Sequence, residues 1–460
     1  MARQHIDMLN GSIWNKLPRF ALPVAATAIL EQLFNASDVA VVGNFTGEGS
    51  TAAVAAVGAN SPIIGLIVNL FVGIALGANV VIVHAVGQGE KQTVQKAVHT
   101  SVLVALLGGL MVALLGELAA APLLRMLNVP DDVLPLALLY LRIYLAGMPV
   151  ILLYNFEAAI FRSVGETKIP LIALAASGVL NVVLNIFFVV VLKMTVNGVA
   201  IATVISNAVS SLLLYLRLRK TALDIHLEPR QLRIDTSALG SILRIGLPAG
   251  IQSAVFAAAN IVIQSAINSL GTVVMAASSA AFNIEVMTYY ILNSFTQACT
   301  TFVGQNFGAG QLKRCKKTLL LCLFEGAIAL GCGIAAILFF GRSLVALFNS
   351  DPEVVANGYL RLLYIMPAHV FSLFYEVMSG YLRGLGISLA PAVLTTLGVC
   401  GVRITWVQFV FPQSPTLATL MTVYPISLGV TALFMLGALL YYRPTKRFAA
   451  LAAQQRVDIG

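Results

Sequence analysis

The chain has 460 residues, of which 59% are apolar and only 10% are charged, and its mean hydropathy is +0.90. A soluble protein usually carries about 25% charged residues, so this composition excludes an ordinary soluble globular protein. The formal net charge of +9 does not indicate nucleic-acid binding, because the basic residues gather in the connections on one side of the predicted membrane spans.

Hydrophobic runs long enough to cross a bilayer follow one another along the chain. A membrane-spanning helix needs about 20 apolar residues. That criterion predicts an all-α polytopic membrane protein with twelve spans, at residues 17–42, 59–84, 97–120, 133–160, 169–192, 198–217, 243–268, 276–303, 318–341, 356–380, 388–411 and 418–441. Pro149 and Pro367, inside spans 4 and 10, predict local bends. No cleavable signal peptide is expected, because the run that starts near Leu17 is too long for one.

The connections between the spans alternate in charge. With a cytoplasmic N-terminus, the cytoplasmic connections collect most of the basic residues, among them Arg217, Arg219, Lys220, Lys313, Arg314, Lys316, Lys317, Arg383, Lys446, Arg447 and Arg456. The opposite connections hold only Arg125, Lys193 and Arg342. The positive-inside rule therefore predicts a multi-pass protein of the plasma (inner) membrane with both termini in the cytoplasm.

The two halves of the chain carry matching phrases in matching order, about 220 residues apart. The pairs are RFALP (19–23) with RIGLP (244–248), VGQGEKQ (86–92) with VGQNFGAGQ (303–311), and FRSVGETKIP (161–170) with YLRGLGISLAP (381–391). Because each half has an even number of spans, the repeat is parallel, with a pseudo-twofold axis along the membrane normal. The sequence predicts an N-lobe at residues 1–220, a cytoplasmic linker at 221–238 and a C-lobe at 239–460. Two six-helix lobes are the plan of an alternating-access transporter.

Together these phrases resemble the multidrug and toxic compound extrusion (MATE) family over essentially the whole chain. The most specific segments are LFNASDVAVVGN (33–44), the two VGQ connections, FRSVGETKIP, NVVLNIFFVV (181–190) and NGVAIATVISN (197–207). The resemblance implies a secondary active antiporter that exports bulky, amphipathic, often cationic compounds, antibiotics included, in exchange for protons or sodium ions. The alternative is a flippase for lipid-linked precursors from the same wider superfamily. The acidic character of the deeply placed charges favours cationic substrates.

Asp38 lies in the middle of the first span, where a charged side chain costs about 2.5–3.5 kcal/mol on insertion scales. The sequence is closer to the DinF-like branch of the family, in which a span-1 aspartate is the coupling residue. Asp38 matches that aspartate, Asn181 a span-5 asparagine and Thr203 a span-6 threonine, whereas Asn185 stands where some members have a second acid. Glu31 is two helical turns from Asp38 and is expected on the same face. The predicted cation-coupling set is Asp38, Glu31, Asn181, Asn185 and Thr203. A purely structural role, as a polar buttress and interhelical glue, is the competing explanation.

Two acids in the second half, Glu285 and Glu376, stand among methionine and aromatic residues. A carboxylate beside aromatic rings suits a drug cation through charge and cation–π contact. The predicted substrate-binding set is Glu285, Glu376, Met287, Tyr290, Phe374 and Tyr375, with ordinary helix packing as the alternative. Glu157 and Glu325 are weaker candidates. Arg403 lies well inside span 11 and is expected to clamp C-lobe helices through a carboxylate or several carbonyls, with substrate contact as the second possibility.

The sequence contains no HExxH, GxSxG or helical histidine pair, and its five cysteines lack metal-ligand spacing. We therefore expect a protein that is not an enzyme and needs no cofactor. Its expected partners are small-molecule drugs or toxic cations, protons or sodium ions, and membrane lipid, but not nucleic acid. One chain supplies both lobes, so a monomer is expected to function. The resemblance implies a bacterial source.

Overall fold

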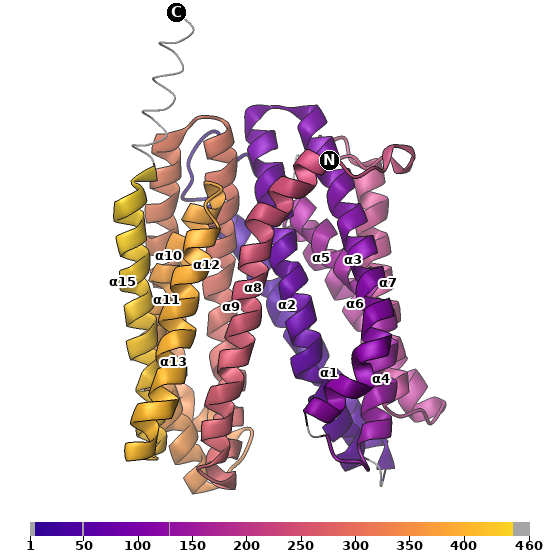
Figure 1. Cartoon of the computed structure of the whole chain (residues 1–460), viewed down its shortest axis with the longest axis vertical. Helices are drawn as coiled ribbons and strands as arrows, with labels where there is room; N and C mark the ends of the chain where they lie inside the picture. The colour runs from indigo at the N-terminus through magenta and orange to yellow at the C-terminus, as the bar shows by residue number, and fades with distance from the viewer. Residues whose placement is uncertain (1–4, 48–49, 128, 445–460) are drawn as a thin grey trace, which may run out of the picture. The chain divides into compact units, whose positions relative to one another are not determined.

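The structure is a computed structural model that describes residues 5–47, 50–127 and 129–444. Within these ranges the regular secondary structure is helical, which confirms the all-α fold (Figure 1). The predicted cytoplasmic residues Lys446, Arg447 and Arg456 lie outside the described residues.

The helices of the first half coincide with the six predicted spans. Most of them extend beyond the predicted apolar windows because polar turns continue the helix at both ends. They are α1 (Leu17–Phe45), α2 (Ser50–Gln88), α3 (Lys91–Met126), α4 (Leu134–Ala146), α5 (Met148–Ser163), α6 (Lys168–Ile186) with the π-helical segment η2 (Phe187–Val191), and α7 (Val196–Lys220).

The helices of the second half again coincide with six predicted spans, and span 11 consists of several short segments. The elements are η3 (Pro229–Gln231) in the linker, α8 (Thr236–Asn268), α9 (Thr272–Gly308), α10 (Leu312–Ala346), α11 (Pro352–Gly384), α12 (Leu389–Thr395), η4 (Thr396–Gly401), α13 (Val402–Thr405), η5 (Trp406–Val410), η6 (Phe411–Gln413), α14 (Leu417–Met421) and α15 (Val423–Tyr442). In the described part of the chain, nine helices are long and apolar enough to cross a membrane, or ten with the bent pair α4 and α5. Helices α1 and α9, with 29 and 37 residues, also exceed the length that a crossing requires.

The bend predicted near Pro149 is present, because α4 and α5 meet at Gly147 with an angle of 50°. A Cβ atom on Gly147 would lie 2.3 Å from Cγ2 of Val204, so glycine lets α7 approach closely at the bend. Pro367 differs, because it lies inside α11, which continues without a break.

The described residues form two compact units. One contains residues 5–6 and 26–250, and the other contains residues 7–25 and 251–444. The changes of unit fall inside helices, shortly after Pro23 in α1 and shortly after Pro248 in α8. Each unit therefore includes the first part of the helix that opens the opposite half of the sequence.

Within the first unit, α2 and the start of α8 cross at glycines spaced four residues apart on both helices. A Cβ atom on Gly73 would lie 2.2 Å from the backbone nitrogen of Gly250, and one on Gly77 would lie 2.3 Å from the carbonyl oxygen of Ile242. Gly246 faces the backbone of Ile74 in the same way. Small residues at this spacing let helix backbones touch, which is the usual basis of tight packing between membrane helices.

The connection from α7 to α8 lies against α3, in the same unit. Two apolar side chains of this segment, Ile225 and Leu227, are fully buried. The backbone N–H of Glu228 donates to Nε2 of His99 over 3.2 Å, and Nδ1 of His99 lies 2.7 Å from the carbonyl oxygen of Gln95. The segment predicted as a linker is therefore packed against the N-terminal half of the chain.

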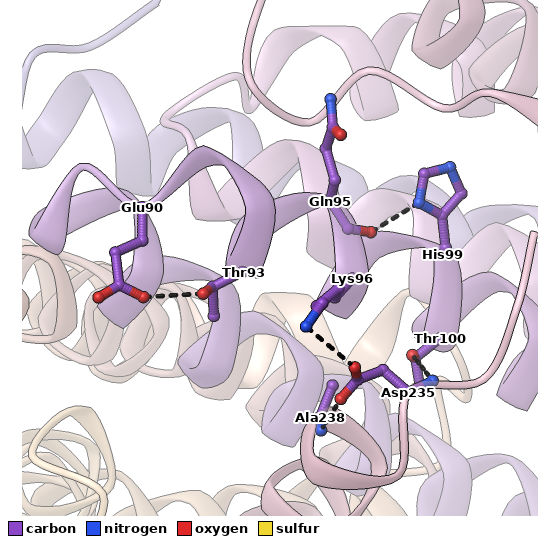
Figure 2. Close-up of polar contacts among 8 residues, drawn as sticks. All are labelled: Glu90, Thr93, Gln95, Lys96, His99, Thr100, Asp235 and Ala238. Atoms are coloured by element: carbon purple, nitrogen blue, oxygen red, sulfur yellow. Dashed lines mark hydrogen bonds and ion pairs between the residues drawn. The ribbon is translucent and has the colours of Figure 1, made fainter. Parts of the chain in front are cut away.

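Asp235 ends this connection and is held from three directions (Figure 2). Its backbone N–H donates to Oγ1 of Thr100 over 3.0 Å, and its carboxylate lies 3.4 Å from Nζ of Lys96. The same carboxylate accepts the backbone N–H of Ala238 at 2.9 Å, so Asp235 also caps the start of α8.

Candidate ion-coupling and substrate sites

Asp38 is buried in α1, and each of its carboxylate oxygens accepts a hydrogen bond from another helix. Nδ2 of Asn185 in α6 donates to Oδ1 over 2.6 Å, and Oγ1 of Thr203 in α7 donates to Oδ2 over 2.9 Å. Nδ2 of Asn185 also donates to Oδ1 of Asn181 over 3.2 Å. The structure thus joins four of the five predicted coupling residues in one buried network.

The fifth predicted coupling residue, Glu31, lies outside this network. It is exposed on α1, whereas Asp38 is only 5% exposed. Two helical turns place the residues along one side of an ideal helix, but burial on that side depends on the neighbouring helices.

The local sequence explains how α1 and α6 come close enough for this network. Asn181 and Asn185 are one turn apart on α6 and therefore present their amides on one side. Gly178 precedes them on the same helix, and a Cβ atom there would lie 1.8 Å from Cζ of Phe34, one turn before Asp38 on α1. The π-helical segment η2 begins directly after α6, and such segments are frequent at functional sites.

The Asp38 network contains two groups whose hydrogen-bonding capacity is not fully used. Oδ1 of Asn185 is buried and has no hydrogen-bond partner among the described residues. Oγ1 of Thr203 lies 2.9 Å from Oδ2 of Asp38 and 3.0 Å from the carbonyl oxygen of Val199. Since a hydroxyl has only one hydrogen, it donates to one of these two acceptors at a time. The network therefore has spare acceptors and an alternative hydrogen-bond arrangement.

A second buried acid of the first unit, Glu157, is fully enclosed in α5. Oγ of Ser211 donates to its Oε2 over 2.9 Å, and Oε1 has no partner among the described residues. The structure does not bring Glu157 into hydrogen-bond contact with the Asp38 network.

In the second unit, Glu285 of α9 forms a buried ion pair with Arg361 of α11. Nη2 of Arg361 lies 2.6 Å from Oε1, and Nε lies 3.2 Å from Oε2, so the pair is bidentate. No local sequence pattern indicates this pairing, because the partners are 76 residues apart. The charge of Glu285 is thus already balanced inside the protein.

Glu376 of α11 is buried beside tyrosines and a guanidinium. Its neighbours include the guanidinium of Arg383 and the side chains of Tyr289 and Tyr375. The sequence assigned Arg383 to a cytoplasmic connection, but this residue is 7% exposed in α11 and donates from Nη2 to Oε1 of Gln252 over 2.7 Å. The chain therefore holds a buried polar cluster that was only partly predicted.

The other predicted substrate residues lie in mixed surroundings. Met287 and Tyr290 are partly buried on α9. Phe374 is 43% exposed, whereas its neighbour Tyr375 is buried. Tyr375 and Glu376 are thus both buried, whereas Phe374 is exposed.

Arg403 in α13 contacts two other helices through neutral groups. Its Nη1 lies 3.2 Å from Oδ1 of Asn260 in α8, and its Nε lies 3.4 Å from Oγ of Ser427 in α15. Its Cζ lies 4.4 Å from the ring centre of Tyr424. Arg403 therefore links helices as expected, but with an amide, a hydroxyl and an aromatic ring rather than a carboxylate. Among the described residues, no group of three or more histidines, cysteines or acids is placed to hold a metal ion.

The duplicated halves of the sequence match a known family. A family model described as MatE matches residues 23–187 and again residues 248–407, one copy in each half. The chain belongs to the MATE family. The family resemblance drawn from the duplicated phrases is confirmed, and the protein is a multidrug efflux transporter of that family.

Relatives of similar length support this assignment. The "Probable multidrug resistance protein YoeA" of Bacillus subtilis (strain 168) is 26% identical over 441 residues, or 94% of each chain. The "Probable multidrug resistance protein YpnP" of the same organism is 28% identical over 442 residues, covering 95% of this chain and 96% of the relative. A solved structure described as the outward-facing conformation of a multidrug resistance MATE family transporter superposes with a TM-score of 0.88 and 22% identity, covering 97% of this chain and 100% of that one. The last match shows the fold.

Proposed function

We propose that this MATE transporter is a proton-coupled antiporter that exports amphipathic cationic compounds by alternating access, with Asp38 carrying the coupling proton. The observation that carries the proposal is the burial of Asp38 among donors from α6 and α7. Intramembrane acids are expensive to bury and usually mark ion pathways. Because the network joins three helices, a change in the charge of Asp38 alters the bonds between those helices.

The hydroxyl of Thr203 supports a proton as the coupling ion. When Asp38 is ionised, Oγ1 of Thr203 donates to its Oδ2. When Asp38 is protonated, the carboxyl donates to Oγ1 of Thr203, and the hydroxyl turns to donate to the carbonyl oxygen of Val199. In both protonation states Oδ2 of Asp38 is therefore hydrogen-bonded to Oγ1 of Thr203, and the exchange requires no backbone movement.

Sodium coupling would use the same residues but requires a larger rearrangement. A sodium ion needs several oxygen ligands, and the network offers the Asp38 carboxylate, the Asn181 and Asn185 amide oxygens, and the Thr203 hydroxyl. The amide of Asn185, however, presents its nitrogen to Asp38. It would have to turn before its oxygen faced a cation at the carboxylate. Because proton binding requires no such turn of Asn185, the proton is favoured as the coupling ion.

For the exported cation we propose Glu376 as the acidic contact in the second unit. Glu376 is buried beside Tyr289 and Tyr375, so charge and aromatic surface lie together. Glu285 is less suited, because its carboxylate is already paired with Arg361. We further propose that the protein lies in a bacterial plasma membrane with both termini in the cytoplasm, because the basic residues favour one side of the predicted spans. We also propose that a monomer functions, because one chain supplies both halves.

The test is export of a fluorescent cation such as ethidium from proteoliposomes, under an imposed proton gradient and, separately, a sodium gradient. Asp38→Asn keeps the shape of the side chain but removes its proton-carrying acid, so we expect gradient-driven export to be lost. Glu117→Gln is the matched control, since Glu117 pairs with Arg142 at 2.8 Å on a half-exposed surface. Export that is driven by the proton gradient and persists in Asp38→Asn would reject Asp38 as the coupling residue. Export driven only by the sodium gradient would reject the proton as the coupling ion.

A further inference from the structure

The three helices that surround Asp38 have counterparts in the second half of the repeat, and these counterparts also meet at one charged residue. Spans 1, 5 and 6 correspond to α1, α6 and α7. Spans 7, 11 and 12 correspond to α8, the segments from α12 to η6, and α15. In the second unit these helices meet at Arg403, through Asn260, Ser427 and Tyr424. The junction of these three helices therefore holds a carboxylate, contributed by span 1, in one half and a guanidinium, contributed by span 11, in the other.

Arg403 differs from a structural arginine in having no balancing charge. It is 8% exposed, and within the described ranges no carboxylate lies within ion-pair distance of it. Its two hydrogen bonds, at 3.2 and 3.4 Å, are long for a cationic donor. A guanidinium has five N–H donors, and a buried charge without a partner is costly. Arg361 in the same unit shows the balanced case, because Glu285 accepts two of its hydrogen bonds.

The aromatic ring beside Arg403 also lies near Arg361. The ring of Tyr424 lies 4.4 Å from Cζ of Arg403 and 5.9 Å from Cζ of Arg361. The cation–π contact offsets part of the charge of Arg403, but Glu285 pairs only with Arg361, so no carboxylate of the described residues balances Arg403. Nδ1 of the buried His369 in the same unit has no hydrogen-bond partner among the described residues.

Two features indicate that an external group reaches this charge. Asn260, which contacts Nη1 of Arg403, is exposed, so only one amide separates the guanidinium from the surface of the unit. In addition, α13 is a single turn of α-helix between the π-helical segments η4 and η5. Such interruptions of a helix occur preferentially at functional sites.

We propose that Arg403 is the recognition site for an oxyanion, a carboxylate or phosphate group, so that this transporter accepts amphiphiles that carry an acidic group beside their cationic part. The planar guanidinium presents paired N–H donors that match the two oxygens of such a group. The side-chain amide of Asn260 turns to donate a further hydrogen bond. This inference rests on the proposed function in one respect, because it takes the ligand of Arg403 to be a compound that the transporter exports.

The experiment measures binding of two rhodamines to the purified full-length protein in detergent by fluorescence anisotropy. One is a rhodamine methyl ester, and the other is its free-acid parent, which differs only in the free carboxylate. In Arg403→Gln we expect affinity for the free acid to fall by about tenfold or more, as for one lost charge-assisted pair, and affinity for the ester to change less than about twofold. Arg342→Gln is the control, because Arg342 also lies over a tyrosine ring, that of Tyr359 at 5.2 Å, but is exposed.

A second variant separates recognition from a structural clamp. Asn260→Asp places a carboxylate next to Arg403, which strengthens a clamp but occupies the guanidinium. We expect it to weaken binding of the free acid and to leave the ester unchanged. Equal losses for both rhodamines in Arg403→Gln, or unchanged binding of the free acid in either variant, would overturn the proposal.

A competition arm identifies the source of the oxyanion. Displacement of the free acid by millimolar inorganic phosphate assigns the site to free oxyanions, and no displacement assigns it to acidic groups carried on the amphiphile. Because binding in detergent needs no ion gradient, this result is independent of Asp38. If export persists in Asp38→Asn but Arg403→Gln loses binding of the free acid, Asp38 is rejected as the coupling residue and Arg403 is still supported as the oxyanion site.

Discussion

The side-chain amide of Asn185 donates both of its hydrogens, one to Oδ1 of Asp38 over 2.6 Å and one to Oδ1 of Asn181 over 3.2 Å. One residue of α6 therefore satisfies the carboxylate of α1 and fixes the orientation of a second amide. Its own oxygen remains without a partner among the described residues. In the proposed coupling mechanism, Asn185 is therefore the residue that links the charge of Asp38 to α6.

Replacement of Asn185 by leucine should uncouple export from the gradient. Leucine has a similar size but leaves Oδ1 of Asp38 without a donor, and a hydrogen bond to a buried charged group contributes about 1.5–3 kcal/mol. We expect initial rates of ethidium export in proteoliposomes to fall about tenfold or more. The control is Asn155→Leu, since Asn155 donates only to the carbonyl oxygen of Ile151 in its own helix. Equal rates in the two variants would show that Asn185 is interhelical glue.

The Glu285–Arg361 pair should behave as a buried ion pair with a large coupling energy. Arg361→Met leaves the carboxylate of Glu285 buried and unpaired, which typically costs about 3–5 kcal/mol. The apparent Tm of the purified protein should therefore drop by several degrees. The double variant Glu285→Gln with Arg361→Met removes both charges and should recover most of the loss. A thermal-shift series on the two single variants and the double variant provides the measurement, and additive losses would contradict the coupling.

The sequence predicted those features that depend on residues near one another in the chain, and it did not predict contacts between distant residues unless family phrases marked them. Apolar runs depend on local composition, and the duplicated phrases fix the two halves, so the spans agree with the helices. The contacts of Asp38 were predicted because family phrases marked all four residues. The pair of Arg361 with Glu285 and the bond from Arg383 to Gln252 join residues 76 and 131 positions apart. Only the packing of α8, α9 and α11 brings them together, and no local pattern records that packing.

Glu31 and Arg403 show the same limit for single residues. The spacing of seven residues predicted that Glu31 and Asp38 lie on the same face of α1. The neighbouring helices cover Asp38 but leave Glu31 exposed. For Arg403, burial inside a span indicated a partner, yet the chemical type of that partner depends on which side chains α8 and α15 present.

The glycine crossing between α2 and α8 should be intolerant of any side chain. In Gly77→Ala the new Cβ atom would lie 2.3 Å from the carbonyl oxygen of Ile242, and a backbone atom cannot turn aside. We expect a lower apparent Tm, since overpacking typically costs about 1–3 kcal/mol. Gly58→Ala in the same helix is the control, because nothing lies within 4 Å of its Cβ position. A lower Tm in Gly58→Ala of the same size would show that the effect is not specific to the crossing.

The connection between α7 and α8 should lose protection against hydrogen exchange in acid. The hydrogen bond from Ala238 N–H, followed by the hydrogen bond and charge of Lys96, lowers the pKa of the Asp235 carboxyl below its ordinary value. For an acid whose pKa is lower in the folded state, the stabilisation is present above the pKa of the unfolded chain, about 3.9. It is lost as the pH falls through the folded-state pKa.

Asp235→Asn tests this pH dependence, because asparagine still caps α8 but cannot form the ion pair with Lys96. Measured by hydrogen exchange and mass spectrometry, residues 221–235 should exchange faster in the variant than in the wild type at neutral pH. The two proteins should converge as the pH falls through the lowered pKa of Asp235, where the wild-type carboxyl also loses its charge. Glu90→Gln is the control, since the Glu90 carboxylate bonds to Thr93 within the first turn of α3 (Figure 2). A difference that persists undiminished in acid would mean that Asp235 positions the connection through its shape and not through its charge.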